Sequence, residues 1–170
     1  MTCIVGIKYF DRVWIGGDRL GSDGYSKEES LRPKVFYNDE YLIGYTSSFR
    51  MGDLLEHVLE PPAYDGSDPH RFLVRNFIPK VIKTFKDNYW FTEGKAQGGE
   101  FLLAFRDNLF KVQDDFSVLS LEETAIGSGE IAALGSLHST EGDPFDRIHA
   151  AIKAADHNIV TVGGDILRTQ

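Results

Sequence analysis

The chain opens on the stretch TCIVGIK, residues 2–8, and returns after a short turn as VWIGGD, residues 13–18. β-Branched residues are frequent in both stretches, and residues 9–12 between them have the composition of a turn, so we expect two neighbouring strands. The glycines of the second stretch indicate a close approach of another backbone. Chain termini ordinarily fray. A strand that begins directly after Thr2 therefore indicates an amino terminus that is held in a sheet.

Further along the chain, the predicted strands come in hairpins and the predicted helices come in pairs. Hairpins in this order favour an antiparallel α+β arrangement over a parallel doubly wound sheet, and we expect one domain over residues 1–170. The pattern predicts a polar loop over 19–33, a hairpin over 34–46, helices over 51–59 and 69–85 with a kink at Pro79, a loop over 94–99, a hairpin over 100–113, a short strand over 116–119, a tight turn over 125–129, helices over 130–138 and 144–157, and closing strands over 158–162 and 166–167.

The composition excludes several classes of protein. The chain has 170 residues, of which 42% are apolar and 26% charged, and this is a globular profile. Its 18 Lys and Arg against 26 Asp and Glu give a net charge of −8, which argues against a nucleic-acid partner and against a protein held on anionic lipid. One cysteine, Cys3, permits no disulfide within the chain. With no export signal and no apolar run of about 18 residues, we expect a cytoplasmic protein without a membrane span.

Common catalytic motifs are missing from the sequence. There is no phosphate-binding loop, and the GSG of residues 127–129 lacks the spacing of a serine-hydrolase elbow. None of the five histidines has a nearby acid at metal-ligand spacing, and one cysteine cannot build a thiolate zinc site. We therefore expect neither a metal nor a cofactor.

Thr2 is the residue that remains as a candidate nucleophile. Methionine is commonly trimmed before a residue as small as threonine, and loss of Met1 gives Thr2 both a hydroxyl and a free α-amine. That amine has an unperturbed pKa of about 7.7–8.0, so it can act as a base near neutral pH. A threonine activated by its own terminal amine is an established form of nucleophilic catalysis.

Several segments together resemble the proteasome β-subunit and HslV-like peptidase family. Thr2, Asp18 and Lys34 are separated by 16 positions each, as in that family. The resemblance runs from Thr2 to about Leu59 and again over residues 125–133, and element order alone carries it between. The matching segments are TCIVGI at 2–7, IGGD at 15–18, Lys34-Val35, YND at 37–39, IGY at 43–45 and AIGSG at 125–129.

This resemblance implies the fold and the roles of the site residues. The family has the N-terminal nucleophile hydrolase fold, a four-layer αββα sandwich whose two antiparallel sheets pack face to face. By resemblance, Thr2 is the nucleophile and its amine the general base, while Lys34 lowers the pKa of the amine and Asp18 pairs with Lys34. Ser128 positions the amine, and the backbone N–H of Ser47 holds the oxyanion.

The sequence departs from the family at two places. The small residue and glycine expected after Gly44 are replaced by YTSS at residues 45–48, which retains a backbone donor but alters the pocket beside it. Near the carboxyl end the family has an Asp and a Ser before a glycine. This chain offers Asn158 and Thr161 before the glycines at 163–164, or Asp156 instead, and the register between these choices stays open.

The resemblance implies a threonine-type endopeptidase that forms a homo-oligomeric, self-compartmentalised ring and cleaves polypeptides. The likeness to HslV also suggests a separate ATP-driven unfoldase as a partner. Two alternatives remain. One is an N-terminal nucleophile amidase that acts on small amides, because fold does not fix substrate. The other is an inactive structural ring subunit, against which the retained Asp18 and Lys34 argue, since a scaffold has no need of a buried charge pair.

Overall fold

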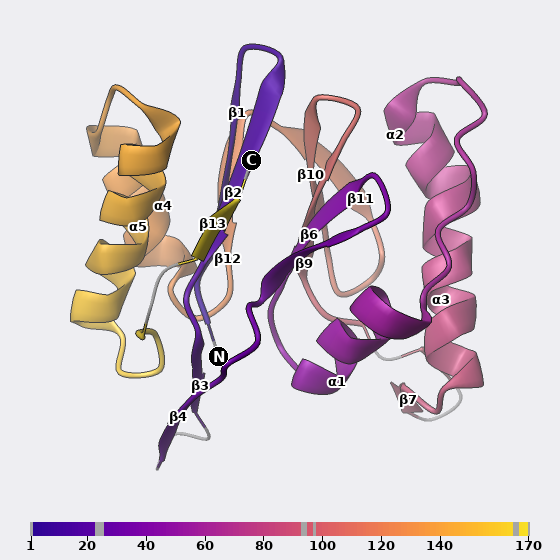
Figure 1. Cartoon of the computed structure of the whole chain (residues 1–170), viewed down its shortest axis with the longest axis horizontal. Coiled ribbons are helices and arrows are strands. Elements are labelled where there is room, and N and C mark those ends of the chain that lie inside the picture. Colours follow the sequence, from indigo (N-terminus) through magenta and orange to yellow (C-terminus); the bar gives the residue numbers. More distant parts are fainter. Residues whose placement is uncertain (1, 23–25, 93–94, 97, 165–166, 170) are drawn as a thin grey trace.

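Two antiparallel sheets lie face to face between two layers of helices in this computed structural model (Figure 1). The structure describes residues 2–22, 26–92, 95–96, 98–164 and 167–169. Helices α4 (Glu130–Ser139) and α5 (Pro144–Asn158) cover the outer face of one sheet, and the helices of residues 49–87 cover the outer face of the other. The predicted four-layer antiparallel α+β sandwich is therefore confirmed.

The first sheet carries the amino-terminal hairpin at its centre. Its strand order is β12-β1-β2-β13. The register of the hairpin places Ile4 opposite Gly17. The start of β1 and the end of β2 therefore lie side by side. The bounds of these strands are β1 Ile4–Tyr9, β2 Arg12–Gly17, β12 Glu123–Ile126 and β13 Leu167–Thr169.

The second sheet is built from consecutive hairpins in the order β11-β10-β9-β6-β5. Strand β5 pairs with β6 with Val35 opposite Gly44, so the residue before β5 and the residue after β6 lie at one end of the sheet. The bounds of these strands are β5 Val35–Asn38, β6 Tyr41–Tyr45, β9 Phe101–Phe105, β10 Asn108–Val112 and β11 Val118–Leu121.

The helices that cover the second sheet contain π-helical turns. Helix α1 (Phe49–Asp53) continues into the turn η1 (Leu54–Val58), and α2 (Pro69–Phe72) continues through η2 (Leu73–Phe77) into α3 (Ile78–Asp87). The expected kink at Pro79 corresponds to the wide turn η2 directly before it, because proline cannot donate the usual backbone hydrogen bond. No helix in the described part of the chain is long and apolar enough to cross a membrane.

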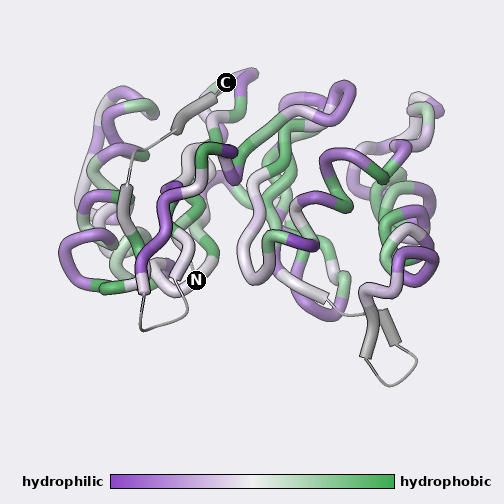
Figure 2. The backbone as a smooth tube through the Cα atoms, turned by 60° about the horizontal axis from the view of Figure 1, so that its bottom comes forward, coloured by the Kyte–Doolittle hydropathy of each residue, from purple (hydrophilic) through white to green (hydrophobic). Residues whose placement is uncertain are grey.

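The interior consists of three apolar layers, and hydrophobic residues accordingly follow the central strands in Figure 2. The layer between the sheets contains Ile4, Ile15 and Val35. A Cβ on Gly17 would lie 2.5 Å from the Ile4 side chain and 3.1 Å from that of Val35. The predicted close approach at this glycine is therefore real, but it comes from side chains of both sheets rather than from a backbone.

Several predicted elements were wrong. The segment 19–33, predicted as a polar loop, contains the hairpin of β3 (Leu20–Ser22) and β4 (Lys27–Glu29). Glycine, serine and charged residues have low strand propensity, so the sequence did not indicate these strands. The loop of 94–99 includes β8 (Lys95–Ala96), which pairs with β7 (Phe91–Thr92), while Gly94 and Gln97 lie outside the described residues.

Two further errors lie near the carboxyl half. Residues 123–126 form β12, so the tight turn begins only at Gly127. The predicted closing strand of 158–162 is absent, because Asn158 ends α5 and the following residues turn. The sheet is closed instead by β13, which pairs with β2, and Ile166 lies outside the described residues.

Candidate active site

Three chain segments bring Thr2, Asp18 and Lys34 to one end of the sandwich. Thr2 lies just before β1 and Asp18 just after β2, so the hairpin register places them together. Lys34 lies just before β5 in the opposite sheet. All three are buried, with exposed fractions of 1%, 0% and 4%. Buried charged residues are rare unless they are paired, and this arrangement pairs them.

The ammonium group of Lys34 lies at the centre of the cluster. Its Nζ donates hydrogen bonds to Thr2 Oγ1 at 2.6 Å, to Asp18 Oδ1 at 3.0 Å and to the Leu20 carbonyl oxygen at 2.5 Å. A lysine ammonium has three donors, so this environment matches each proton with one acceptor. Burial lowers the pKa of Lys34, and the nearby charge of Asp18 opposes that effect only in part.

The carboxylate of Asp18 is held by hydrogen bonds from both its own sheet and a distant loop. It accepts from the Thr2 hydroxyl, from the Cys3 N–H at 3.0 Å and from the Gly163 N–H at 3.3 Å. These donors, together with Lys34, offset the cost of burying an ionised carboxylate. Asp18 therefore orients both the nucleophile candidate and the lysine.

Ser128 fixes the backbone of Thr2. The Thr2 N–H donates to Ser128 Oγ at 3.2 Å, and the Thr2 carbonyl accepts from the Gly129 N–H at 3.2 Å. Gly127 lets this turn approach the backbone of Thr2. Its φ is 93°, and a Cβ at this position would lie only 2.4 Å from the Thr2 carbonyl oxygen. The Thr161 hydroxyl lies 3.0 Å from Ser128 Oγ.

Of the candidates near the carboxyl end, Thr161 is the one whose hydroxyl contacts Ser128. Asn158 is exposed and donates to the Ala154 carbonyl of its own helix at 2.7 Å. Asp156 forms an ion pair of 3.7 Å with Lys153. Only Thr161 of these three reaches the hydrogen bonds around Thr2, through Ser128. A hydroxyl residue shortly before two glycines was the available sequence signal.

Ser47 lies beside Thr2 in a loop with an unusual backbone. Its φ is 73°, a left-handed conformation that only glycine adopts without strain. The loop is held by the Glu100 carbonyl, which accepts from both the N–H and the hydroxyl of Thr46 at 3.1 Å. Within the described residues, the N–H of Ser47 has no acceptor. A small pocket of about 30 Å³ is lined here by Thr2, Lys34, Tyr45, Thr46, Ser47, Ser48 and Phe49.

An ion cluster around the buried Lys111 links the Thr46 loop to the Ser128 turn, and sequence reasoning missed it. Lys111, on β10, is 8% exposed and contacts Glu130 at 3.0 Å and Glu100 at 3.2 Å. Glu100 holds Thr46 through its backbone, and Glu130 begins the helix directly after the Ser128 turn. The only signal was a lysine among apolar residues on a strand. The charges of both glutamates outweigh burial and raise the pKa of Lys111.

The other reactive groups near Thr2 are unsuited to a role in chemistry. Burial, with the charge of Asp18, raises the pKa of the fully buried Cys3 thiol to about 12, so it stays protonated and inert. No group of three or more potential metal-ligating side chains occurs among the described residues.

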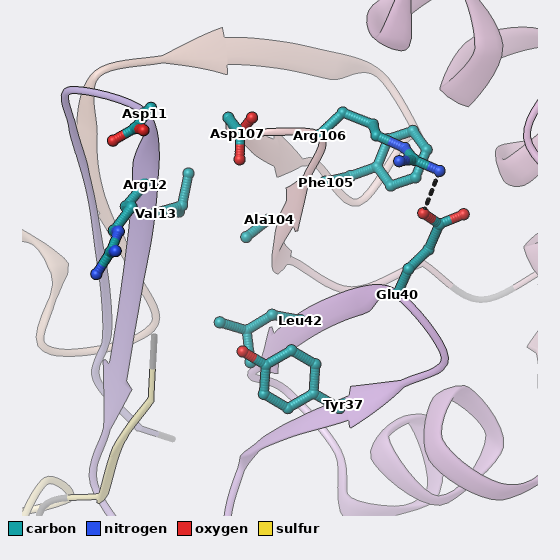
Figure 3. Close-up of a pocket in the computed structure, with 10 residues that line it drawn as sticks. All are labelled: Asp11, Arg12, Val13, Tyr37, Glu40, Leu42, Ala104, Phe105, Arg106 and Asp107. Atoms are coloured by element: carbon teal, nitrogen blue, oxygen red, sulfur yellow. Dashed lines mark ion pairs between the residues drawn. The ribbon is translucent and has the colours of Figure 1, made fainter. Parts of the chain in front are cut away.

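A second pocket lies at the opposite end of the sandwich (Figure 3). It is near the turn between β1 and β2, a six-residue strand or about 20 Å away from Thr2. Asp11 and Asp107 lie at its upper rim in Figure 3, and Arg106 forms an ion pair of 2.5 Å with Glu40. Val13, Leu42 and Ala104 are its apolar wall. This pocket is separate from the cluster around Thr2.

No protein-family model matches this chain, and no curated protein matches it. Solved structures do match its fold. BPH of Thiobacillus denitrificans in complex with epoxomicin has a TM-score of 0.83 at 19% identity, with 99% of this chain and 97% of that chain covered. BPH of the same organism in a second structure has a TM-score of 0.82 at 19% identity, covering 99% and 96%. Eukaryotic HslV from Trypanosoma brucei has a TM-score of 0.68 at 18% identity, covering 99% and 98%. The chain thus has the fold that its sequence resemblance to HslV implied.

Proposed function

We propose that this chain is a threonine-type endopeptidase whose nucleophile is Thr2 after removal of Met1. The observation that carries the proposal is the buried ammonium of Lys34, 2.6 Å from Thr2 Oγ1 and 3.0 Å from Asp18 Oδ1. A buried charge destabilises a protein unless it is paired, and strongly buried charges often occur at functional sites. The Lys34 ammonium is paired with Asp18 and also contacts the hydroxyl of the candidate nucleophile. The fold shared with HslV and BPH supports the same activity.

The proposed reaction passes through an ester on Thr2. Thr2 Oγ1 attacks the carbonyl carbon of the scissile peptide bond, and its proton passes to the free α-amine. The carbon–nitrogen bond then breaks, and the amine returns that proton to the leaving nitrogen. A water molecule attacks the ester, giving one proton to the amine, which passes it to Thr2 Oγ1 as the carboxylic product leaves. Lys34 stays protonated and stabilises negative charge that develops on Thr2 Oγ1.

The oxyanion is assigned to the N–H of Ser47. This donor lacks an acceptor among the described residues and lies in the loop that lines the pocket with Thr2. The left-handed backbone of Ser47 sets the direction of its N–H independently of its side chain. Ser128 positions the amine, because its Oγ already lies 3.2 Å from the Thr2 nitrogen.

The proposed active form is a cytoplasmic homo-oligomeric ring that takes polypeptides, with an ATP-driven unfoldase as a partner. Most apolar residues of 51–59 do not provide a contact surface for a second copy, because Met51, Leu54 and Leu55 are fully buried against the sheet. Exposed apolar side chains occur in both helical layers: Phe49, Val58 and Val74 in this one, and Ile131 and Leu134 on α4, where they are 87% and 36% exposed. The spacing of three residues between Ile131 and Leu134 places them on one face of α4, which supports a contact with a second copy.

An amidase for small amides is the second candidate function. The small size of the pocket beside Thr2, about 30 Å³, favours it. Light scattering with size exclusion separates the two, since we expect an oligomer for the peptidase. A 19.1 kDa monomer at every concentration would favour the amidase.

Hydrolysis of peptide amides by the purified protein tests the activity itself. Intact mass first establishes that Met1 is gone. Thr2→Ala then abolishes turnover, Thr2→Ser retains part of it, and Thr140→Ala, which removes a hydroxyl from the end of α4, leaves it unchanged. Epoxomicin, the compound bound to BPH, should protect the wild-type protein against thermal unfolding but not Thr2→Ala. Equal turnover by Thr2→Ala would disprove the proposal, and retained Met1 without turnover would favour an inactive ring subunit.

A further inference from the structure

A hollow of about 280 Å³ lies directly beside the pocket of Thr2. It is lined by Gly21, Ser22, Ser26, Glu28 and Phe49. Phe49 also lines the Thr2 pocket, so the two hollows share one wall. The residue before Gly21 contributes the carbonyl that holds Lys34 Nζ at 2.5 Å. A chain bound across Thr2 therefore has a side-chain space within one residue of the catalytic cluster.

An aromatic ring and a carboxylate flank this hollow. A Cβ on Gly21 would lie 3.1 Å from the ring of Phe49, so the ring lies over the glycine. Gly21 is directly opposite Glu28 in the antiparallel pair of β3 and β4. Opposite residues of such a pair send their side chains to the same face of the sheet. Glu28 and Phe49 therefore border one space, and the absence of a side chain on Gly21 lets the ring lie against the backbone there.

Among the described residues, the charge at this hollow is negative. The carboxylate of Glu28 is exposed and has no hydrogen-bond or ion-pair partner in the described part of the chain. Lys27 belongs to the opposite face of the pair, since side chains alternate along a strand. Lys34 is buried and committed to Asp18. None of the described residues that line the hollow is a lysine or an arginine.

We propose that this hollow binds a basic side chain of the substrate, so that the chain cleaves peptides carrying Arg or Lys near the scissile bond. The inference rests on the proposed function. The carboxylate of Glu28 pairs with the cation, and the face of Phe49 adds a cation–π contact. Ser22 and Ser26 give the hollow a polar edge that suits a charged group. The carboxylate of Glu28 repels an acidic side chain of the substrate. An aliphatic side chain forms no ion pair with this carboxylate.

Peptide amides that differ at one position test this specificity. Arg, Leu or Glu is placed in turn at each of the three positions before the scissile bond, and kcat/KM is measured for each. Exposed ion pairs and cation–π contacts each change affinity only a few-fold, so we expect Arg to exceed Glu by about tenfold at one position. Glu28→Gln reduces the ratio of Arg to Leu and Glu28→Lys reverses it, while Glu141→Gln, in the loop after α4, leaves the ratio unchanged.

Binding separates failure of this inference from failure of the proposed function. The Thr2→Ala protein is titrated by calorimetry with the Arg and Glu peptides, which requires no turnover. Tighter binding of the Arg peptide, lost in Thr2→Ala/Glu28→Lys, supports the subsite even if wild-type protein cleaves nothing. Cleavage with no preference for Arg at any of the three positions, or a preference that survives Glu28→Lys, overturns the subsite and leaves the peptidase intact.

Discussion

Lys34 and Thr2 lie just before strands of different sheets, yet the lysine Nζ lies 2.6 Å from the threonine Oγ1. The same Nζ is 3.0 Å from Asp18, which lies on the sheet of Thr2. The cluster therefore closes one end of the sandwich, where it joins the two sheets through charge rather than through apolar contact. The proposed activity and the stability of the fold should both depend on this junction, and the variants below separate the two.

Replacing Lys34 should lower both the rate and the stability of the fold. We expect Lys34→Ala to lower kcat/KM by about 100-fold or more, because the charge beside the nucleophile is lost. The change also leaves Asp18 buried without its partner, at a cost of about 3 kcal/mol in the free energy of unfolding. Lys34→Arg does not restore activity, since guanidinium is larger and planar. Kinetics and urea unfolding measure both effects, and a loss in rate of less than a few-fold would contradict the assigned role.

The pH profile reports the lowered pKa of Lys34. Because burial favours its neutral form, Lys34 loses its proton below the ordinary 10.5, and kcat/KM should fall on the alkaline side before that value. Between the two pKa values the unfolded chain binds more protons than the folded one. The contribution of Lys34 to the free energy of unfolding therefore rises with pH in that window. A rate that stays constant up to pH 10.5 would show that the charged form is not needed.

Gly127 and Gly135 form a matched pair of glycine positions. Gly127→Ala places a methyl group 2.4 Å from the Thr2 carbonyl oxygen at a φ of 93°, so it displaces Thr2 and destabilises the fold by more than about 1 kcal/mol. Gly135→Ala meets nothing within 4 Å in helix α4 and should stabilise by roughly 0.5–1 kcal/mol. Thermal unfolding and peptide hydrolysis of both variants check the contrast. Full activity in Gly127→Ala would show that the turn does not position Thr2.

Ser47→Gly distinguishes the backbone of this residue from its hydroxyl. Glycine adopts a φ of 73° without strain, so the variant should gain up to about 1 kcal/mol of stability. Activity should stay within a few-fold of wild type, because the backbone N–H remains. Ser47→Val, whose branched side chain resists this conformation, should lose at least about tenfold in kcat. Loss of activity in Ser47→Gly would instead assign a role to the hydroxyl.

Lys111→Met removes the ionic link between the Thr46 loop and the Ser128 turn. Both Glu100 and Glu130 are partly exposed, so water partly compensates them, and we expect a stability loss of only about 1–2 kcal/mol. The Thr46 loop and the Ser128 turn become less fixed, which should lower kcat more than it changes KM. Lys111→Arg, which keeps the charge, should recover most of the rate. An equal kcat for Lys111→Met and wild type would show that the ion cluster contributes to stability but not to the rate.

Local sequence determined the amino-terminal hairpin and much of the order of elements. β-Branched residues and a four-residue turn specify β1 and β2, and that register alone places Thr2 beside Asp18. The helix starts at Asp68 and Asp143 were equally predictable, because each side chain caps a helix whose first residue is proline. The strands of 20–22 and 27–29 were missed because their glycine, serine and charged residues carry no apolar alternation.

Tertiary structure alone decided which distant residues meet Thr2. Lys34 comes from the other sheet and Ser128 from a turn 126 positions away, so only the packing of the sheets and the pairing of β12 with β1 bring them within hydrogen-bond distance. Thr161 and Lys111 gave no periodic signal, because their partners lie on other elements. The sequence by itself determines strands, caps and the spacing of candidate residues, since these depend on neighbours along the chain. Long-range contacts among buried polar groups depend on how the layers pack, and no local pattern encodes that.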